Sequence, residues 1–499
     1  MRLGNPSTAL KKKAEESPFS IAYLDPERTV SYGALNQLVE RAGASLRHAG
    51  LVQWESAGLY FSDQLLTLAF TLAAIRFGHP ILLLQPNRGE APVSLALLKS
   101  NTSHVFTDRA DNDLPKIDTH LIADINVLTQ STLTVPEHEA IAWPTSLPVF
   151  CFLGSGTTGS PKVIAHNEDA ILDMMTREMM IAPFLPRDRI MSLADFSYFA
   201  ALRPALGAIA KFGTAVTVSK IISIPWLINF CQRMKVDHIS MGHLHGVALL
   251  KDLSNQKPAL PELKSLTLSS SPIPGTMRER LIKQVSPNLR IVYGTNEFGT
   301  ATHLNYANRS SVNPASVGPV LAAVGTVLDA IKIRIVDSSG TELPVGEVGQ
   351  IEMYSGATFF GYLTGEENPM DSSGWHKSGD LGQISAEGEL IFAGRADDMM
   401  IFNGINIYPR EIEYVLEQNS QLDEVAVVSA PSSVHGDIPI AFVSSLHSDL
   451  DVGVLLEDVT KALGTKAPKR IIQLEALPRN TAGKILKREL VEMVTQIES

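Results

Sequence analysis

A glycine-rich stretch with hydroxyl side chains and one lysine is the first feature with recognisable chemistry. Residues 154–162 read Gly-Ser-Gly-Thr-Thr-Gly-Ser-Pro-Lys and follow an apolar run over 149–153. Glycines let backbone amides approach an anion, hydroxyls can donate to phosphate oxygens, and the lysine adds positive charge. The stretch therefore predicts a phosphate-binding loop. Its expected contacts are Ser155, Gly156, Thr157, Thr158, Gly159 and Lys162.

The spacing of the glycines and the lysine can be compared with two other phosphate-binding patterns. The three glycines also fit a dinucleotide-binding fingerprint, but that fold needs a helix directly after the last glycine. Pro161 and the β-favouring Val163 oppose a helix there. The P-loop pattern requires Gly-Lys followed by Ser or Thr, whereas Ser160 and Pro161 precede Lys162. A flexible surface loop stays open on these residues alone, although it does not account for the lysine beside a hydroxyl cluster.

Four further motifs follow the loop in order along the chain. They are Tyr293-Gly294-Thr295-Asn296-Glu297, Gly374-Trp375-His376-Lys377-Ser378-Gly379-Asp380, Gly394-Arg395-Ala396-Asp397-Asp398, and Pro478-Arg479-Asn480-Thr481-Ala482-Gly483-Lys484-Ile485. Each alone could be a common turn. Together with the loop they resemble, over nearly the whole chain, the adenylate-forming superfamily of acyl- and aryl-CoA synthetases, luciferases and adenylation domains of nonribosomal peptide synthetases. A nonenzymatic relative that only binds nucleotide is an alternative.

The resemblance implies ATP-dependent activation of a carboxylic acid to an acyl-AMP, followed by transfer to the thiol of CoA or of a phosphopantetheinyl carrier protein. Joining a carboxylate to the α-phosphate brings two anions together, so the site must supply positive charge. By resemblance Lys484 bridges the two anions and is the expected catalytic residue. Glu297 is expected to assist catalysis by holding Mg2+, a hard cation that prefers carboxylate and phosphate oxygens.

The nucleotide's sugar and base have their own expected contacts. Asp380 can accept hydrogen bonds from both ribose hydroxyls, and Arg395 can donate to ribose or phosphate. Tyr293 offers a ring face to adenine. Asn296 stands where the family has a threonine or serine, and its amide can still hydrogen-bond phosphate. The expected ATP contacts outside the loop are Tyr293, Gly294, Asn296, Asp380 and Arg395.

The second half-reaction is expected to use a domain movement. Asp397 matches the family's hinge, about which the small domain rotates after adenylation so that Gly404 lines a tunnel for the thiol. The sequence also departs from the family pattern at Gly154, which replaces a hydroxyl residue, and at Val163, which replaces a glycine. Both changes alter the phosphate loop.

The acid is expected to be a small aryl or heteroaryl acid. Residues 192–213 align without gaps to aryl-CoA ligases, and a long acyl chain would need a deep apolar tunnel. The expected acyl pocket consists of Phe196, Tyr198, Phe199, His243, Ser269 and Ser270. A histidine satisfied by backbone is the other interpretation of His243. Asp195 leaves open a free-standing amino-acid adenylation enzyme that loads a separate carrier protein, because an aspartate near this position pairs the substrate ammonium in peptide synthetases.

Composition excludes several other classes. The 499 residues predict two or more domains, and a net charge of -11 with a pI near 5.7 opposes binding to nucleic acid. Two cysteines are too few for a thiolate zinc site or a disulfide framework.

The amino-terminal lysines precede no apolar signal region, so a cytoplasmic protein is expected. Residues 65–84 are interrupted by Arg76 and Pro80, which predicts a buried helix and strand rather than a membrane span.

The elements that must hold these residues follow from periodicity. A helix is expected between Ser31, as its cap, and Gly50, and another over 65–77. Short apolar runs at 81–84, 149–153, 215–218 and 290–293 alternate with helices, which predicts an α/β fold with largely parallel sheet. Strands at 333–337 and 350–354 indicate a β-rich subregion. We expect a large N-terminal domain of α/β sheets over 1–396 and a small mobile α+β C-terminal domain over 397–499.

Overall fold

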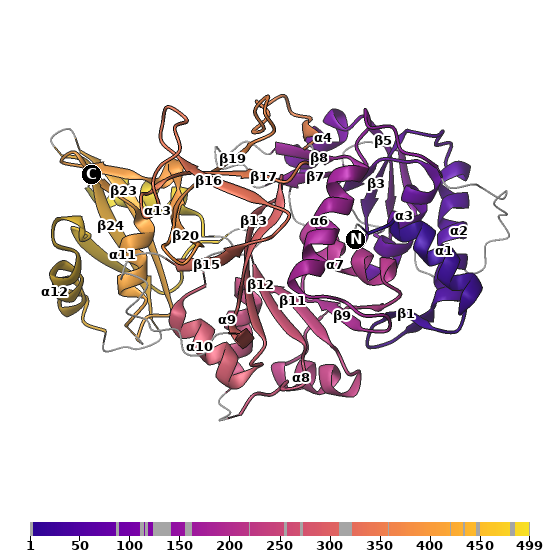
Figure 1. The fold of residues 1–499 in the computed structure, drawn as a ribbon, viewed down its shortest axis with the longest axis horizontal. Coiled ribbons are helices and arrows are strands. Elements are labelled where there is room, and N and C mark those ends of the chain that lie inside the picture. Colours follow the sequence, from indigo (N-terminus) through magenta and orange to yellow (C-terminus); the bar gives the residue numbers. More distant parts are fainter. Residues whose placement is uncertain are drawn as a thin grey trace. The chain divides into compact units, whose positions relative to one another are not determined.

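The computed structural model describes residues 3–85, 89–109, 114, 118–122, 141–154, 162–218, 220–253, 257–269, 273–308, 322–357, 359–419, 421–432, 435–445, 450–479 and 485–498. The chain divides into two compact units, and neither is continuous in sequence. Unit 1 comprises Met1–Leu268, Gly294–Ala301 and Ser355–Gly374, and unit 2 comprises Ser269–Tyr293, Thr302–Tyr354 and Trp375–Ser499. Figure 1 shows both units in colours that follow the sequence.

The first sheet of unit 1 carries the predicted phosphate loop. In spatial order its strands are β18 (Gly361–Tyr362), β8 (Lys162–His166), β7 (Phe150–Gly154), β4 (Ile81–Leu83), β3 (Ser56–Tyr60), β5 (Thr102–Thr107) and β6 (Asp118–Leu121). The strands from β7 to β6 pair in parallel, whereas β8 pairs antiparallel with both β7 and β18. A strand, not a helix, therefore begins at Lys162, which excludes the dinucleotide-binding interpretation. Residues 155–161 lie outside the described residues.

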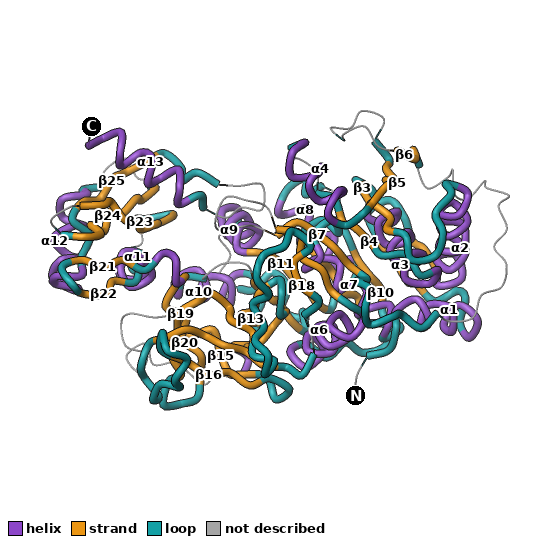
Figure 2. Tube along the Cα trace, turned by 90° about the horizontal axis from the view of Figure 1, so that it is seen from above, coloured by secondary structure: helices purple, strands orange, loops and turns teal. Residues whose placement is uncertain are grey.

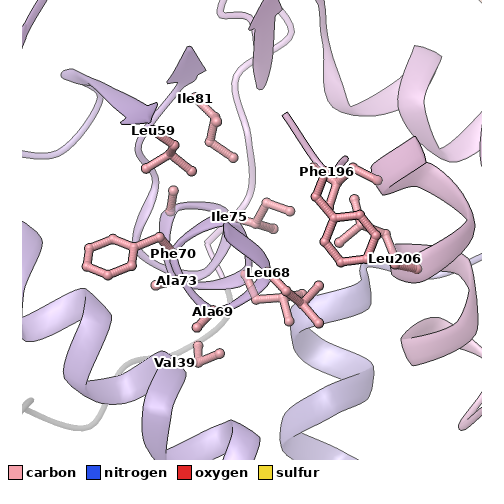
Figure 3. Packing of buried hydrophobic residues seen from close by; sticks show 14 of the residues in the cluster. Val39, Leu59, Leu68, Ala69, Phe70, Ala73, Ile75, Ile81, Phe196 and Leu206 are labelled. Atoms are coloured by element: carbon pink, nitrogen blue, oxygen red, sulfur yellow. The ribbon is translucent and has the colours of Figure 1, made fainter. Parts of the chain in front are cut away.

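Helix α3 (Gln64–Phe77) is the centre of the largest core of unit 1. Asp63 caps it by accepting from the Leu65 and Leu66 amides, and it ends at Gly78. Almost every residue of the helix is buried, because apolar side chains surround its axis. Figure 3 shows its side chains facing Val39 on one side, Leu59 and Ile81 on another, and Phe196 and Leu206 on a third. The predicted buried helix followed by a strand is confirmed.

The remaining elements of unit 1 are the strands of a second sheet and the helices that cover the two sheets. The strands run β12 (Ser265–Ser269), β11 (His238–Gly242), β9 (Arg189–Ser192), β10 (Thr214–Val216), β1 (Ile21–Leu24) and β2 (Thr29–Ser31), with β11, β9, β10 and β1 parallel. The helices are α1 (Pro6–Glu16), α2 (Tyr32–His48), α4 (Glu90–Lys99), α6 (Glu168–Ile181), α7 (Phe199–Ala210), α8 (Ile224–Arg233) and α9 (His243–Asp252). Ser31 accepts from the Ala34 amide at the start of α2, as predicted. The largely parallel α/β architecture is confirmed.

Unit 2 begins with a β-rich region, as the close-set strands predicted. Strands β16 (Lys332–Val336), β17 (Gly349–Tyr354), β19 (His376–Ile384), β20 (Glu389–Arg395) and β15 (Ala322–Val327) are successive antiparallel neighbours. Strands β13 (Leu289–Thr295) and β14 (Gly299–Asn305) each contain one of the points at which the chain passes between the units. Helix α10 (Gly275–Gln284) precedes them. Residues 309–321 are not among the described residues.

The carboxyl-terminal part of unit 2 has its own sheet and two hydrophobic clusters. Its strands are β22 (Ile405–Ile407), β21 (Met400–Phe402), β24 (Gly436–Ser444), β23 (Glu424–Ser432) and β25 (Arg470–Leu474), and its helices are α11 (Pro409–Leu416), α12 (Val452–Leu463) and α13 (Lys487–Glu498). Figure 2 shows the three helices gathered around this sheet. The predicted helix with Pro409 in its first turn is confirmed. None of the helices that the structure describes is long and apolar enough to cross a bilayer.

Candidate active site

In unit 1, Tyr362 contacts both charged residues that the phosphate site was predicted to use. Its hydroxyl donates a hydrogen bond to Glu297 Oε1 at 2.7 Å. Lys162 Nζ lies 4.7 Å from the centroid of the same ring, within the range of a cation–π contact. Lys162 is the first residue of β8, Glu297 is in the turn between β13 and β14, and Tyr362 ends β18. Three distant segments thus bring a cation and an anion to one aromatic ring.

The backbone around Glu297 is held by two buried side chains. His166 is fully buried, and its Nε2 lies 2.8 Å from the carbonyl of Asn296. Because a carbonyl can only accept, His166 donates this hydrogen bond. Arg177 in α6 donates to the carbonyls of Thr300 and Phe298, the former at 2.6 Å. Burial lowers the pKa of Arg177 to about 10, so the guanidinium remains charged at neutral pH.

Gly294 and Asn296 are both exposed in this turn. A side chain at Gly294 would place its Cβ 2.1 Å from the carbonyl oxygen of Gly299, so the backbone approach requires glycine. The backbone carbonyl of Asn296 accepts the hydrogen bond from His166. The amide group of the Asn296 side chain is not used in that bond. The turn therefore presents polar groups to solvent on a fixed backbone.

In unit 2, the predicted ribose contacts form a second cluster around Asp380. Its carboxylate is buried and accepts from the Tyr293 hydroxyl at 2.7 Å and from Arg395 Nη1 at 2.9 Å. Ser378 Oγ accepts from the Asp380 amide at 3.0 Å, which fixes the backbone. Each carboxylate oxygen has a second lone pair, so two hydroxyls could still donate to it.

Electrostatics keep this second cluster in one protonation state. Burial and the neighbouring Asp380 raise the pKa of Tyr293 well above its usual value, so its hydroxyl stays a donor. Burial opposes the charge of Arg395, but Asp380 outweighs that effect and the net pKa is raised. A carboxylate held between a phenol and a guanidinium is suited to bind neutral hydroxyl donors.

The predicted acyl-pocket aromatics differ in exposure. Phe196 is 1% exposed and belongs to the core around α3 (Figure 3), and Phe199 stacks on Phe152 and on His166. Tyr198 is half-buried. His243, the first residue of α9, and Ser269, the last residue of β12, are also half-buried. The structure thus leaves partial exposure at Tyr198, His243 and Ser269.

Asp195 is occupied by contacts within the chain. Gln64 Nε2 donates to its Oδ2 at 2.7 Å, and the Ser197 amide donates to its Oδ1 at 2.7 Å. The same Gln64 accepts from the Phe196 amide at 2.7 Å. Asp195 therefore shapes the turn before α7.

The predicted hinge and tunnel residues are both exposed. Asp397 lies in a 3-10 turn, η2 (Ala396–Asp398), with its side chain 68% exposed and 4.0 Å from Arg395 Nη2. Gly404 sits between β21 and β22 with a φ of 78°, and no atom lies within 4 Å of the place a Cβ would take. Its open, left-handed backbone favours glycine.

Several predicted residues lie outside the described residues. They are Ser155, Gly156, Thr157, Thr158, Gly159, Ser270 and Lys484. Conversely, sequence reasoning missed four buried or half-buried residues that hold the site together: Gln64, His166, Arg177 and Tyr362. A histidine that follows three buried apolar residues in its strand, as His166 does, was the one local signal available.

A glycine-rich segment between two strands, a carboxylate and a lysine on one tyrosine, and a buried aspartate that pairs with an arginine and a tyrosine are typical of nucleotide-binding enzymes with an α/β fold. The chain belongs to the AMP-binding enzyme family, which residues 10–363 match, and residues 411–484 match the AMP-binding enzyme C-terminal domain. The predicted adenylate-forming relationship is thereby confirmed, and the chain is an AMP-forming acid–thiol ligase.

Relatives and solved structures agree with this assignment. The long-chain-fatty-acid–CoA ligase FadD13 of Mycobacterium tuberculosis is 25% identical over 520 residues, covering 97% of both chains. The 2-succinylbenzoate–CoA ligase of Listeria monocytogenes is 24% identical, covering 97% of this chain and 98% of its own. The Bacillus subtilis o-succinylbenzoate CoA synthetase MenE, solved with its acyl-adenylate intermediate, superposes with a TM-score of 0.85 at 22% identity and covers 98% of each chain. The same enzyme has been solved with ATP and magnesium ion, with a TM-score of 0.84, 22% identity, and coverage of 97% of this chain and 98% of its own.

Proposed function

We propose that this protein joins a small aryl or heteroaryl carboxylic acid to the AMP portion of ATP, releases pyrophosphate, and passes the acyl group to the thiol of CoA. The observation that carries the first half-reaction is the Tyr362-linked pair of Lys162 and Glu297 beside the glycine-rich segment. Two opposite charges at a phosphate site can bind two different partners. The Lys162 ammonium can bind phosphate, and the Glu297 carboxylate can bind a metal ion.

Glu297 fits the role of a Mg2+ ligand. Mg2+ is usually held by one or two carboxylates together with substrate phosphates and water. Glu297 supplies one such carboxylate, and the described residues contain no cluster of three or more His, Cys, Asp or Glu side chains that could form a complete metal cage. When bound, Mg2+ would offset negative charge on the phosphate oxygens. The fixed turn at 296–300 holds the carboxylate for this purpose.

Asp380, Arg395 and Tyr293 are proposed to bind the nucleoside. The Asp380 carboxylate accepts from the two ribose hydroxyls, Arg395 pairs with that carboxylate and can donate to phosphate, and Tyr293 places its ring against adenine. This assignment is supported by the 2.7 Å and 2.9 Å hydrogen bonds that already orient Asp380.

Lys484 is proposed as the catalytic cation of adenylation, since the α-phosphate and the carboxylate both carry negative charge where their bond forms. For the thiol step we place the boundary of a mobile small domain between residues 396 and 397. Rotation at Asp397 would then bring Gly404 to the thiol path. The exposure of Asp397 and the open backbone of Gly404 support these roles.

The preference for an aryl acid rests on the residues that remain accessible. Tyr198 and His243 of unit 1 are half-buried and polar, which suits a short ring better than a long chain. The curated relatives include 4-chlorobenzoate– and indoleacetate–CoA ligases, at 26% identity each. An amino acid is the alternative substrate, and Asp195, whose oxygens accept hydrogen bonds from Gln64 and from the Ser197 amide, is the residue that would pair with its ammonium group. CoA is the proposed acceptor, a separate carrier protein is the alternative, and the cytoplasm is the proposed location.

The test is a pyrophosphate-exchange screen with ATP, Mg2+ and a panel of aryl carboxylic acids, fatty acids and amino acids. A parallel set of reactions contains EDTA to remove the metal ion. Exchange with an aryl acid that EDTA abolishes is expected, and mass spectrometry with CoA should then detect the acyl-CoA. Acylation of a phosphopantetheinyl carrier protein but not of CoA would reassign the acceptor. ATP binding without exchange for any acid would instead indicate a relative that only binds nucleotide.

A further inference from the structure

Lys162 and Glu297 contact different parts of the Tyr362 side chain. Lys162 lies over the ring face, at 4.7 Å from the centroid, whereas Glu297 accepts from the hydroxyl at 2.7 Å. All three side chains are half-buried, so a ligand could still reach the two charged groups. One aromatic side chain therefore holds a cation and an anion at two separate positions.

The position of Tyr362 is fixed by the strand that carries Lys162. Tyr362 pairs with Ile164 and Gly361 pairs with Ala165 in antiparallel register between β18 and β8. Just beyond it, the Leu363 amide donates to the Val163 carbonyl at 2.9 Å. The Val163 amide donates to Thr364 Oγ1 at 3.1 Å. These bonds set the ring beside Lys162.

The arrangement matters because Lys162 and Glu297 have opposite charges. A lysine that pairs directly with a carboxylate gives up part of its attraction for phosphate, and the carboxylate gives up part of its attraction for a metal ion. An aromatic face attracts an ammonium group without neutralising it. A phenol hydrogen bond orients a carboxylate while leaving its charge and its other lone pairs available.

We propose that Tyr362 is a positioning residue that keeps Lys162 and Glu297 from pairing with each other and holds each toward its own ligand. Lys162 is held for a nucleotide phosphate, and Glu297 is held for a divalent cation. The inference rests on the proposed function, in which ATP and Mg2+ bind here. It assigns to Tyr362 a role in both contacts at once.

The experiment measures ATP binding by calorimetry on the full chain, once with Mg2+ and once with EDTA, so no acid is needed. Tyr362→Phe keeps the ring and removes the hydroxyl. It should leave ATP affinity in EDTA within about twofold of wild type, but should reduce the gain given by Mg2+ about tenfold, the effect of one hydrogen bond to a charged group. Binding of Mn2+ to the ATP complex, followed by electron paramagnetic resonance, should weaken by the same factor.

Tyr362→Leu removes the ring as well, so Lys162 should move onto Glu297 and ATP affinity in EDTA should fall about tenfold. Adding Glu297→Gln removes the competing charge and should restore that affinity to within about twofold. The matched control is Tyr354→Phe, since Tyr354 is another half-buried tyrosine with a lysine, Lys332, 5.7 Å from its ring centroid. It should match wild type in every arm.

Two results would overturn the proposal: a Tyr362→Phe variant that keeps the whole Mg2+ gain, or a Tyr362→Leu variant that Glu297→Gln fails to rescue. Thermal melts confirm that each variant is folded, and Tyr362→Phe alone decides the matter if the leucine variant does not fold. Wild-type protein that binds ATP with Mg2+ but activates no acid would refute the proposed function alone. Absence of ATP binding by wild type would refute both.

Discussion

At the scale of single residues, the site depends on side chains that orient other side chains. Tyr293 and Arg395 hold Asp380, His166 holds the turn before Glu297, and Gln64 holds Asp195. Preorganised polar groups of this kind lower the cost of reorganisation when charge develops during a reaction. The residues that contact the reacting atoms are then few, and Lys484 is the proposed one for adenylation.

Replacing Lys484 with alanine should reduce acyl-adenylate formation about a hundredfold or more, as removal of a single charged donor does elsewhere. Transfer from chemically prepared acyl adenylate to the thiol should continue, because this lysine is proposed to act only in the first half-reaction. Single-turnover assays of each step provide the measurement. Stabilisation by saturating ATP in a thermal melt is the control, and adenylation within a fewfold of wild type would refute the role.

At the scale of elements, ion pairs connect the turn η2 to the helices α11 and α13. Lys487, which begins α13, forms ion pairs with Glu413 of α11 at 3.0 Å and with Asp398 of η2 at 3.6 Å. Arg410 of the same α11 lies 3.6 Å from Glu413 and pairs with Glu417 at 2.5 Å. Two helices and the proposed hinge thus share one charged network.

Proline at position 397 should impair thiol transfer more than adenylation. Proline fixes φ near -65° and restricts the residue before it, so a hinge that must pass through other angles would be blocked in one orientation. The measurement is the ratio of the two half-reaction rates, with Asp397→Ala as the control that changes charge without fixing φ. Equal loss of both half-reactions would argue against a hinge here.

Glu413→Gln should destabilise the carboxyl-terminal sheet and helices by about 1.5 to 3 kcal/mol, because Arg410 and Lys487 would each lose one of two carboxylate partners. Hydrogen exchange of the β23 and β24 amides measures the local free energy of opening. The control is Glu492→Gln, which removes an exposed pair with Arg488 and should cost about 0 to 1 kcal/mol. Equal effects of the two changes would exclude a structural role for the network.

At the scale of the whole molecule, burial makes the stability of the fold depend on pH. It lowers the pKa of His79, His120, His238, His245 and His303 below the ordinary value of about 6.5. As pH falls through that value, the unfolded chain takes up protons that the folded chain does not, so the free energy of unfolding decreases. Burial raises the pKa of Glu178, which acts in the opposite direction, but it is one group against five histidines.

The expected result is a melting temperature that falls steadily from pH 7.5 to pH 5.5 at constant ionic strength. Replacing a buried histidine, as in His79→Gln, should flatten part of that slope. Replacing the exposed His435 with glutamine should not change it. A melting temperature that is constant or rises as pH falls would contradict the linkage.

Features of the fold and of the candidate site could be predicted from the sequence when residues close together in the chain determine them. The Ser31 cap, the apolar surroundings of α3 and the strand after Pro161 depend on neighbouring residues, and all three agree with the structure. Asp380 and Arg395 were predicted to share a site from distinctive motifs, and their side chains do form an ion pair. Tyr362 was missed because its role depends on contacts such as that between Val163 and Thr364, 201 residues apart, for which the local sequence gives no signal.

The interleaving of the two units also constrains how the protein is made on the ribosome. Unit 1 needs Ser355–Gly374, which follow Leu268 only after about a hundred further residues have been synthesised. At ordinary rates that interval lasts roughly 5 to 20 s. Until then β8 lacks its neighbour β18, and Lys162 and Glu297 lack Tyr362. The nascent chain must therefore leave an edge of its first sheet unpaired while most of the β-rich region is still being translated, which gives chaperones a defined period in which to bind it.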